Sequence, residues 1–387
     1  MSIRGKAYIA GVYEHPLREI PDRSSSQIQA EVAFGALADA GLTLADVDGY
    51  FTDSAHGFGG LSMADYLGLK LRHIDSTETG GSSYVVHVGH AAEAIAAGKC
   101  SVALITMAGR PRSAAMGMGR GGEPVPDSVF EGLWGMSGAV TGYALAATRH
   151  MYQYGTTSAQ MAEVKVAASL HAQHNPNAFL PKAVTVEEVL DSPMISSPLR
   201  RMDCCVVTDS GGAIVVVSPE IAASLNRPRV KVLGHGEAVK HADMGRLDLT
   251  YTGAVVSGPI AFEEAGVTPA DIKYASIYDS FTITVIETIE DLGFCEKGKG
   301  GEFVLDGGLV APFGKLPFNT DGGGLCNNHP SNRGGVTKVI EAVRQLRGEA
   351  NGPTQVPNCN IALAHGTGGS IGARMGSSTL ILGQEDA

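Results

Sequence analysis

The sequence predicts an α/β protein built from two similar halves. Apolar runs typical of buried strands alternate with segments of helical periodicity along most of the 387 residues. Residues 36–48 align without gaps to residues 261–273, which indicates an internal duplication. Loops and two helical patterns interrupt this alternation over about residues 110–200. We therefore expect a first half over residues 1–225 that carries a mostly helical insertion, and a second half over residues 226–387.

The first half begins with strands and helices in alternation. Residues 7–12 predict a buried strand, and residues 24–40 predict a helix with Ser25 or Ser26 as N-cap and Gly41 after its last turn. Residues 71–77 and 101–107 predict strands, and the helix between them opens at residues 80–83 and ends near residue 97. The insertion contains helical patterns over residues 143–154 and 158–174, and strands are expected after it at 204–207 and 213–218.

The second half shows the same alternation. Strands are expected at residues 230–233, 274–278, 361–364 and 378–382. One helix ends at Gly266, a second covers residues 282–292, and residues 295–308 predict a polar loop. A further helix follows Gly335, where apolar residues recur at helical spacing, namely Val336, Val339, Ile340, Val343 and Leu346.

Composition and charge exclude several classes of function. The formal net charge of −11 leaves no basic surface for nucleic acid or for an anionic membrane. No run of 18 apolar residues occurs, so no membrane-spanning helix is expected. The six cysteines contain no CxxC pair, which argues against a zinc ribbon and is typical of a cytoplasmic protein. The histidine pairs 87/90 and 171/174 lack a suitably spaced third ligand, so we expect no metal site.

Residues 321–347 have the features of a reactive site. A run of three glycines, residues 322–324, allows the backbone to approach another group closely. Asn327, Asn328 and His329 follow with three adjacent polar side chains, and Pro330 ends any preceding regular element. Glycines followed by an imidazole and then by a helix are typical of a reactive site on an α/β scaffold.

Four short motifs, in this order along the chain, resemble those of the thiolase superfamily. They are Asp203-Cys-Cys, Tyr278-Asp-Ser-Phe281, His329-Pro330 ahead of Gly334-Gly335, and His365-Gly-Thr-Gly-Gly369. The chain is most similar to the sterol-carrier-protein-type thiolases and the lipid-transfer-protein aldolases. The resemblance implies a duplicated five-layer αβαβα fold and a homodimer. It also implies an acyltransferase that acts on acyl-CoA thioesters, with coenzyme A as part of the substrate and no permanently bound cofactor.

The departures from the family pattern bear on the chemistry. The nucleophilic cysteine of family thiolases falls at Ser82 in this chain, and Ser280 stands where the sterol-carrier-type enzymes have a second cysteine. A serine hydroxyl is a far weaker nucleophile than a thiolate unless a base activates it. Tyr278 matches the aldolase pattern, whereas His329-Pro330 is thiolase-like. A retro-aldol lyase and a non-catalytic acyl-CoA-binding subunit therefore remain as alternatives, and relatives often pair with a small OB-fold, zinc-ribbon protein.

Five residues are candidates for the chemistry. We expect His329 and Asn328 to stabilise an oxyanion, and Tyr278 to transfer a proton. His365 is expected to form a second polar wall, and Ser82 to donate from a helix N-terminus or simply to cap that helix. The alternatives are purely structural roles, namely bracing of a loop by His329, core packing by Tyr278 and a tight turn at His365.

The substrate is expected to lie against glycines of the two glycine-rich motifs, namely Gly323, Gly324, Gly366 and Gly368. Cys326 is either a replacement nucleophile or, more simply, a small packing residue. Arg110, Arg112 and Arg120 are candidates to contact the phosphates of coenzyme A.

Overall fold

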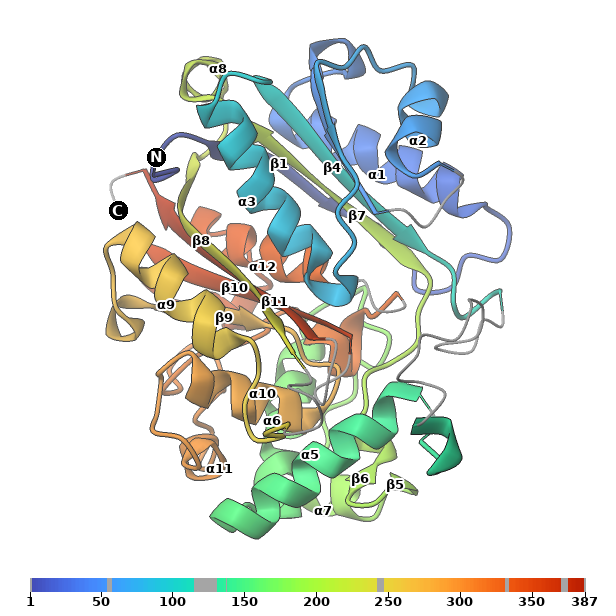
Figure 1. Ribbon diagram of the computed structural model, residues 1–387, viewed down its shortest axis with the longest axis vertical. Coiled ribbons are helices and arrows are strands. Elements are labelled where there is room, and N and C mark those ends of the chain that lie inside the picture. The colour runs from blue at the N-terminus through green and yellow to red at the C-terminus, as the bar shows by residue number, and fades with distance from the viewer. Residues whose placement is uncertain are drawn as a thin grey trace.

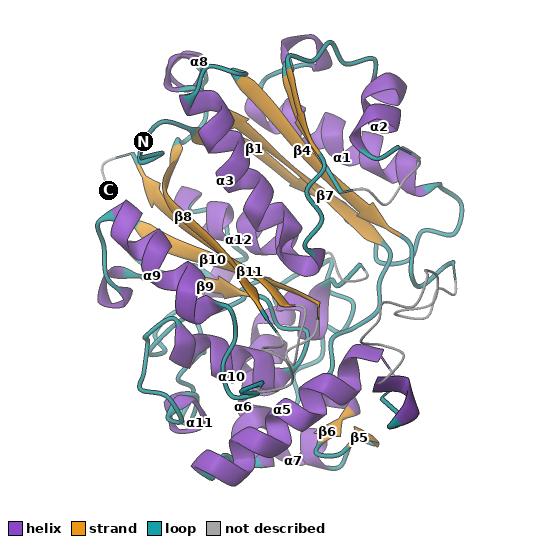
Figure 2. Ribbon diagram, viewed as in Figure 1, coloured by secondary structure: helices purple, strands orange, loops and turns teal. Residues whose placement is uncertain are grey.

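The computed structural model describes residues 2–53, 58–114, 131–136, 138–241, 247–330, 334–369 and 375–385. Its strands form one mixed sheet of nine, in the order β3-β2-β4-β7-β1-β8-β11-β10-β9, together with a small two-stranded hairpin (Figures 1 and 2). The α/β prediction is confirmed. The large sheet consists of two half-sheets, and β1 joins β8 through two paired positions, Tyr8 with Lys231 and Ile9 with Val230.

The first half-sheet contains β1 (Tyr8–Glu14), β2 (Gly49–Phe51), β3 (His73–Asp75), β4 (Val102–Gly109) and β7 (Ser210–Val217). The helices of this half outside the insertion are α1 (Ser25–Ala40), α2 (Gly60–Leu67), α3 (Ser83–Ala96) and α8 (Pro219–Ser224). The second half-sheet contains β8 (Val230–Lys240), β9 (Tyr274–Ile277), β10 (Ile361–Gly369) and β11 (Met375–Gln384). Its helices are α9 (Ala254–Ala265), α10 (Thr282–Asp291), α11 (Gly300–Phe303) and α12 (Gly335–Arg347).

Helices α3 and α12 form the middle layer of the molecule. Both contact strands of the two half-sheets, and Figure 1 shows α3 passing between the two groups of strands. Helix α1 covers the outer face of the first half-sheet, and α9 covers the outer face of the second. Val85 and Val88 of α3 and Val339 and Val343 of α12 belong to one apolar cluster with strand residues from both halves. The expected five-layer arrangement is therefore confirmed, and its centre is held by apolar burial.

The internal duplication is visible in matching helix ends. Helix α1 ends at Gly41 and helix α9 ends at Gly266, both in the left-handed conformation that glycine adopts without strain. In the next turn, the backbone N–H and hydroxyl of Thr43 donate to Asp46 at 2.8 Å, and those of Thr268 donate to Asp271 at the same distances. The chain thus repeats the same capping chemistry at the equivalent point of each half. The boundary at residue 225 itself remains a prediction.

The insertion packs beside the second half. It contains α5 (Gly138–Tyr154), α6 (Ser158–Ala172), α7 (Val186–Leu190) and a hairpin of β5 (Met194–Ser196) and β6 (Leu199–Arg200). Helices α5 and α6 contact α10, and α6 also contacts the turn at Gly323–Asn327. The insertion therefore reaches the glycine-rich stretch that the sequence singles out.

Three local predictions were wrong. Ser24, rather than Ser25 or Ser26, caps α1, because its side chain accepts the N–H of Gln27 in a reciprocal capping box. The predicted strand at 204–207 is a loop with one isolated bridge, from Cys204 to Phe281, because the amides of Cys205 and Val206 donate to Ser280 O and Gly324 O, neither of which lies in a strand. The predicted loop at 295–308 contains the short helix α11. None of the described helices is both long and apolar enough to cross a membrane.

Candidate active site

Asp279 anchors the glycine-rich stretch. Residues Gly323–Asn327 form one π-helical turn. The N–H groups of Gly324 and Leu325 donate to the two carboxylate oxygens of Asp279 at 2.8 and 3.1 Å, and Lys338 Nζ lies 2.9 Å from Oδ1. Gly323 has φ = 59°, and a Cβ there would lie 2.2 Å from Asp279 Oδ2. Glycine is therefore required so that the turn can approach this carboxylate.

This geometry gives the amides of Gly323 and Gly324 partners within the protein, and their contact with the substrate remains a prediction. Gly323 N–H donates to Asp321 Oδ1 at 2.9 Å, and Gly324 N–H donates to Asp279. Both amides already have carboxylate partners, so the close approach that glycine allows here is to the protein itself.

Tyr278 and His329 meet in a buried pair. Tyr278 follows β9 directly, and its Oη lies 2.9 Å from His329 Nε2, with the two rings edge to face. Both side chains line a cavity of about 50 Å³. The other described residues that line it are Ala139, Tyr143, Cys205, Ser280, Phe281, Thr367, Gly368 and Gly369. Strand β9, the glycine-rich stretch, the insertion and β10 therefore converge here.

The titratable groups of this cavity are uncharged near neutral pH. Burial lowers the pKa of His329 to about 4, although the charge of Asp279 acts in the opposite direction. Burial raises the pKa of Tyr278 well above 10 and the pKa of Tyr143 to about 12. Burial also raises the pKa of Cys205, and the neighbouring Cys204 and Asp279 add to that rise. The cavity thus holds a neutral imidazole, two phenols and a thiol.

The second ring nitrogen of His329 bears on the chemistry of the pair. His329 Nδ1 is buried and has no hydrogen-bond partner among the described residues. Tyr278 keeps its hydrogen because of its raised pKa. If that hydrogen is donated to Nε2, Nδ1 must carry the hydrogen of the neutral imidazole. The pair can therefore present an N–H donor to a bound oxygen.

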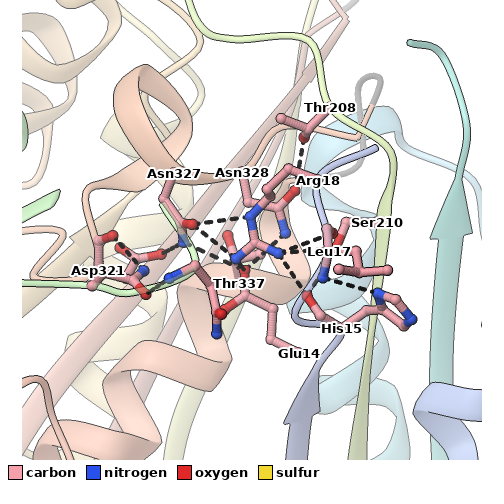
Figure 3. A network of polar contacts seen from close by, with 12 residues as sticks. Glu14, His15, Leu17, Arg18, Thr208, Ser210, Asp321, Asn327, Asn328 and Thr337 are labelled. Carbon is pink, nitrogen blue, oxygen red and sulfur yellow. Dashed lines mark hydrogen bonds and ion pairs between the residues drawn. The ribbon is translucent and has the colours of Figure 1, made fainter. Parts of the chain in front are cut away.

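Asn328 is not among the described residues that line the cavity. Its Nδ2 donates to Glu14 Oε1 at 2.8 Å, and its Oδ1 accepts the hydroxyl of Thr208 at 2.8 Å. Figure 3 shows the Asn328 side chain between these two residues. This geometry opposes the expected oxyanion role, because both ends of the amide are already bonded.

His365 lies among hydroxyl groups instead of in the cavity wall. Its Nδ1 is 2.9 Å from Thr379 Oγ1 and its Nε2 is 3.4 Å from Ser377 Oγ, both on the paired strand β11. Burial lowers its pKa to about 3. The predicted second polar wall is therefore not formed by this side chain. Thr367, two residues further along the same strand, lines the cavity in its place.

Ser82 faces a different space. Its hydroxyl donates to Thr79 O at 2.8 Å and makes no capping bond to α3. The expected capping role is therefore wrong, and donation to a substrate remains a prediction. It lines a second cavity of about 280 Å³, together with Thr79, Glu237 and Ser377 among others. A Cβ at Gly366 would lie 2.9 Å from Ser82 Cα, and one at Gly368 would lie 1.7 Å from Thr79 O. These glycines let β10 lie against the turn before α3, and Gly368 also lines the first cavity.

The remaining candidates have structural partners. Cys326 is buried with its Sγ 3.1 Å from Lys165 Nζ and is not among the described cavity residues. Arg110 donates to the carbonyls of Ile20 and Pro21, and Arg112 pairs with Glu19. Arg120 lies outside the described residues. Three or more His, Cys, Asp or Glu side chains placed to hold a metal ion do not occur among the described residues.

Among the cavity residues that sequence reasoning did not name as candidates, Cys205 and Tyr143 are the two with titratable side chains. The sequence favours a structural role for Cys205, although this residue belongs to the Asp203-Cys-Cys motif, which is a usable signal. Tyr143 lies on α5 of the insertion, and it stacks on Phe281 with ring centroids 4.4 Å apart. No local pattern could place it, because its contact with the cavity depends on how the insertion docks.

Comparisons with known proteins agree with the architecture. A family model described as "Thiolase C-terminal domain-like" matches residues 236–384. The chain is 32% identical over 381 residues to an "Acetyl-CoA acetyltransferase" of Methanothermobacter thermautotrophicus, covering 94% of this chain and 96% of that protein. It is 32% identical over 398 residues to a "Steroid side-chain-cleaving aldolase" of Thermomonospora curvata, covering 98% of each. The solved "Ltp2-ChsH2(DUF35) aldolase" superposes with a TM-score of 0.90 at 30% identity, covering 100% of both chains.

Proposed function

This chain belongs to the thiolase superfamily, and within it we propose a retro-aldol lyase that cleaves the bond between Cα and Cβ of a CoA thioester. The substrate is a 3-hydroxyacyl-CoA, and the reaction uses no permanently bound cofactor. Similarity over the whole chain to one relative named as an aldolase and to one solved aldolase supports this choice.

The observation that carries the proposal is the buried Tyr278–His329 pair in a cavity without an activated thiol. Acyl transfer through the enzyme needs a thiolate, which a nearby cation or a helix N-terminus must stabilise. Ser82 occupies the family's cysteine position, and the Cys205 thiol has a raised pKa. Aldol cleavage needs a group that removes a proton from the 3-hydroxyl and a donor for the enolate oxygen. The pair supports both requirements.

In the proposed step, the 3-hydroxyl gives its proton to Tyr278 Oη while Tyr278 passes its own hydrogen to His329 Nε2 over their 2.9 Å contact. The Cα–Cβ bond breaks, Cβ becomes a carbonyl carbon, and the electron pair moves into the thioester as an enolate. The Nδ1–H of the resulting imidazolium holds the enolate oxygen. The proton then returns through Tyr278 to Cα, which yields an aldehyde or ketone and a shorter acyl-CoA.

Acyl transfer is the second candidate, and one observation favours it. The Cys205 thiol lines the same cavity as His329, so a substrate in the cavity would lie beside a sulfur atom. Transfer would proceed through an acyl group on Cys205, not on Cys326. The non-catalytic alternative predicts binding of acyl-CoA without turnover.

We extend the proposal to partners and location. The solved aldolase that superposes on this chain is named together with a DUF35 protein, which supports a small partner of the OB-fold, zinc-ribbon kind for this chain. A homodimer in the cytoplasm, as expected from the resemblance and the composition, completes the proposal.

The test is an assay of the purified chain, alone and with a DUF35-type partner, on a 3-hydroxyacyl-CoA. Mass spectrometry of the small molecules is expected to show the carbonyl product and the shorter acyl-CoA, with the protein mass unchanged. An acylated Cys205 and CoA-dependent cleavage of a 3-ketoacyl-CoA would instead establish transfer. Bound but unchanged substrate under all conditions would establish the non-catalytic alternative.

A further inference from the structure

A line of three hydrogen bonds leads from the His329 backbone to a buried carboxylate in the other half of the chain. The His329 N–H donates to Thr208 Oγ1 at 2.9 Å, and the Thr208 hydroxyl donates to Asn328 Oδ1 at 2.8 Å. The Asn328 Nδ2 then donates to Glu14 Oε1 at 2.8 Å. Thr208, Asn328 and Glu14 are drawn together in Figure 3. These hydrogen bonds connect the end of β1, the loop before β7 and the segment directly after the glycine-rich stretch.

The direction of every bond in this line is determined. A backbone N–H can only donate, so the Thr208 oxygen accepts from His329 and its single hydrogen is left for Asn328. The Asn328 oxygen accepts that hydrogen, so its amide nitrogen faces Glu14. A carboxylate only accepts, which ends the line. Thr208 is thus the one side chain that joins the His329 backbone to the rest of the line.

Two arginine side chains hold the Glu14 carboxylate, at which these hydrogen bonds end. Arg18 Nη2 lies 2.9 Å from Glu14 Oε1, and Arg344 Nη1 lies 3.3 Å from Oε2. The same Arg18 donates to Asn327 Oδ1 through Nε and Nη2 at 3.1 and 2.8 Å. Although burial opposes it, these guanidinium groups hold the pKa of Glu14 below its ordinary value. The carboxylate therefore stays charged and provides a rigid anchor.

We infer that Thr208 is a positioning residue for the reaction: its hydroxyl sets the orientation of His329, and thereby the contact with Tyr278, from the first half of the chain. Thr208 is not among the described cavity residues, so it acts through His329 and not on the substrate. The expected effect of Thr208 on kcat rests on the proposed function. Its effect on the orientation of His329 does not depend on that function. The loop that carries Thr208 also carries Cys205, so one segment places two components of the cavity.

The test compares Thr208→Val, which removes the hydroxyl and keeps the branched shape, with Thr208→Ser, which keeps the hydroxyl. Because small misplacements of a catalytic group are costly, Thr208→Val should lower kcat roughly 10- to 100-fold and change KM less than about threefold. Thr208→Ser should stay within about threefold of the wild-type kcat. Thr354→Val is the matched control, since it removes a hydroxyl that donates to Asn351 O at 2.8 Å and lies 3.5 Å from Thr320 O, and Thr354 makes no described contact with His329.

A second readout needs no substrate. In protein containing nitrogen-labelled histidine, the His329 ring signals can be assigned by their loss in His329→Gln. Thr208→Val should shift these signals toward a weaker Tyr278 contact, and Thr208→Ser and Thr354→Val should not. If the wild type shows no lyase activity, the proposed function fails and this measurement still decides the inference. Should Thr208→Val not fold, Asn328→Ala, which removes the acceptor of the Thr208 hydroxyl, should give the same shift.

The inference is overturned if Thr208→Val leaves both kcat and the His329 signals unchanged. It is also overturned if Thr208→Ser loses as much activity as Thr208→Val, because the hydroxyl would then not be the cause. An equal loss of kcat in Thr354→Val would show a general effect of stability and would likewise refute it.

Discussion

Asp279 and Lys338 form a buried ion pair directly behind the candidate active site, with Lys338 Nζ 2.9 Å from Asp279 Oδ1 and both side chains at most 1% exposed. The same carboxylate accepts two backbone N–H groups of the π-helical turn. The pair therefore connects α12, the loop after β9 and the glycine-rich stretch, so the stability of the fold and the geometry of the site depend on the same contacts.

Loss of the cation from this pair should destabilise the fold strongly. Lys338→Met leaves the Asp279 carboxylate buried without its counter-charge, which typically costs about 3–5 kcal/mol. Urea denaturation of the two proteins measures the difference. Lys182→Met is the control, because Lys182 and Glu188 form an exposed pair and the change should stay below about 1 kcal/mol. Equal effects of the two substitutions would contradict the importance of burial here.

Removal of one hydroxyl from the Tyr278–His329 pair should abolish most of the activity. Tyr278→Phe keeps the ring packing but removes the contact with His329 Nε2. Loss of general acid–base catalysis should lower kcat roughly 10²- to 10⁴-fold with a small change in KM. Steady-state kinetics on the 3-hydroxyacyl-CoA measure this. The exposed Tyr152→Phe should behave as wild type, and a fully active Tyr278→Phe would remove Tyr278 from the mechanism.

A methyl group at Gly323 should disturb the π-helical turn. The alanine Cβ would lie 2.2 Å from Asp279 Oδ2 at a φ of 59°, so clash adds to backbone strain. The free energy of unfolding should fall by more than about 3 kcal/mol. Gly41→Ala has a similar φ, 73°, with no heavy atom within 4 Å, and strain alone should cost about 1 kcal/mol. If both variants lose the same stability, the clash with Asp279 is not real.

Buried histidines should make the protein less stable in mild acid. Burial lowers the pKa of His365 to about 3, below its ordinary value of 6.5, so the unfolded chain takes up this proton first as pH falls. The contribution of His365 is therefore fully present above about pH 7 and declines as the pH falls toward 3. The same sign holds for four other histidines whose pKa values burial lowers to about 4, namely His87, His171, His235 and His329.

His365→Gln isolates one of these contributions. Between about pH 7 and pH 5, the wild type should lose about 2 kcal/mol through His365 alone, since a tenfold change in proton affinity equals about 1.4 kcal/mol. Urea denaturation at both pH values should show a decrease that is smaller by this amount in His365→Gln. If the free energy of unfolding falls by the same amount in His365→Gln as in the wild type, His365 is already protonated, or exposed, in the folded protein. His90, whose pKa is raised to about 10 by Asp75 and Glu237, acts with the opposite sign and at higher pH.

The strands, the helices and the duplication could be predicted because their signals are local, whereas the five-layer arrangement was an implication of the family resemblance. The apolar spacing of α12 can be recognised within a short segment of sequence, and so can the helix ends at Gly41 and Gly266. The motifs likewise brought Tyr278 and His329 together. The orientations of Asn328 and His365 could not be predicted, because each depends on partners far away, Glu14 and Thr379. A polar residue beside a predicted site can face either the substrate or the supporting network, and sequence spacing alone does not distinguish these.

The most direct test of the central claim compares Cys205→Ser with Tyr278→Phe in the cleavage of a 3-hydroxyacyl-CoA, followed by mass spectrometry. If the Tyr278–His329 pair does the chemistry without a thiolate, Cys205→Ser keeps cleaving, Tyr278→Phe does not, and the wild-type protein gains no acyl mass. Loss of turnover in Cys205→Ser, together with an acyl group trapped on Cys205 in the wild type, would contradict the account.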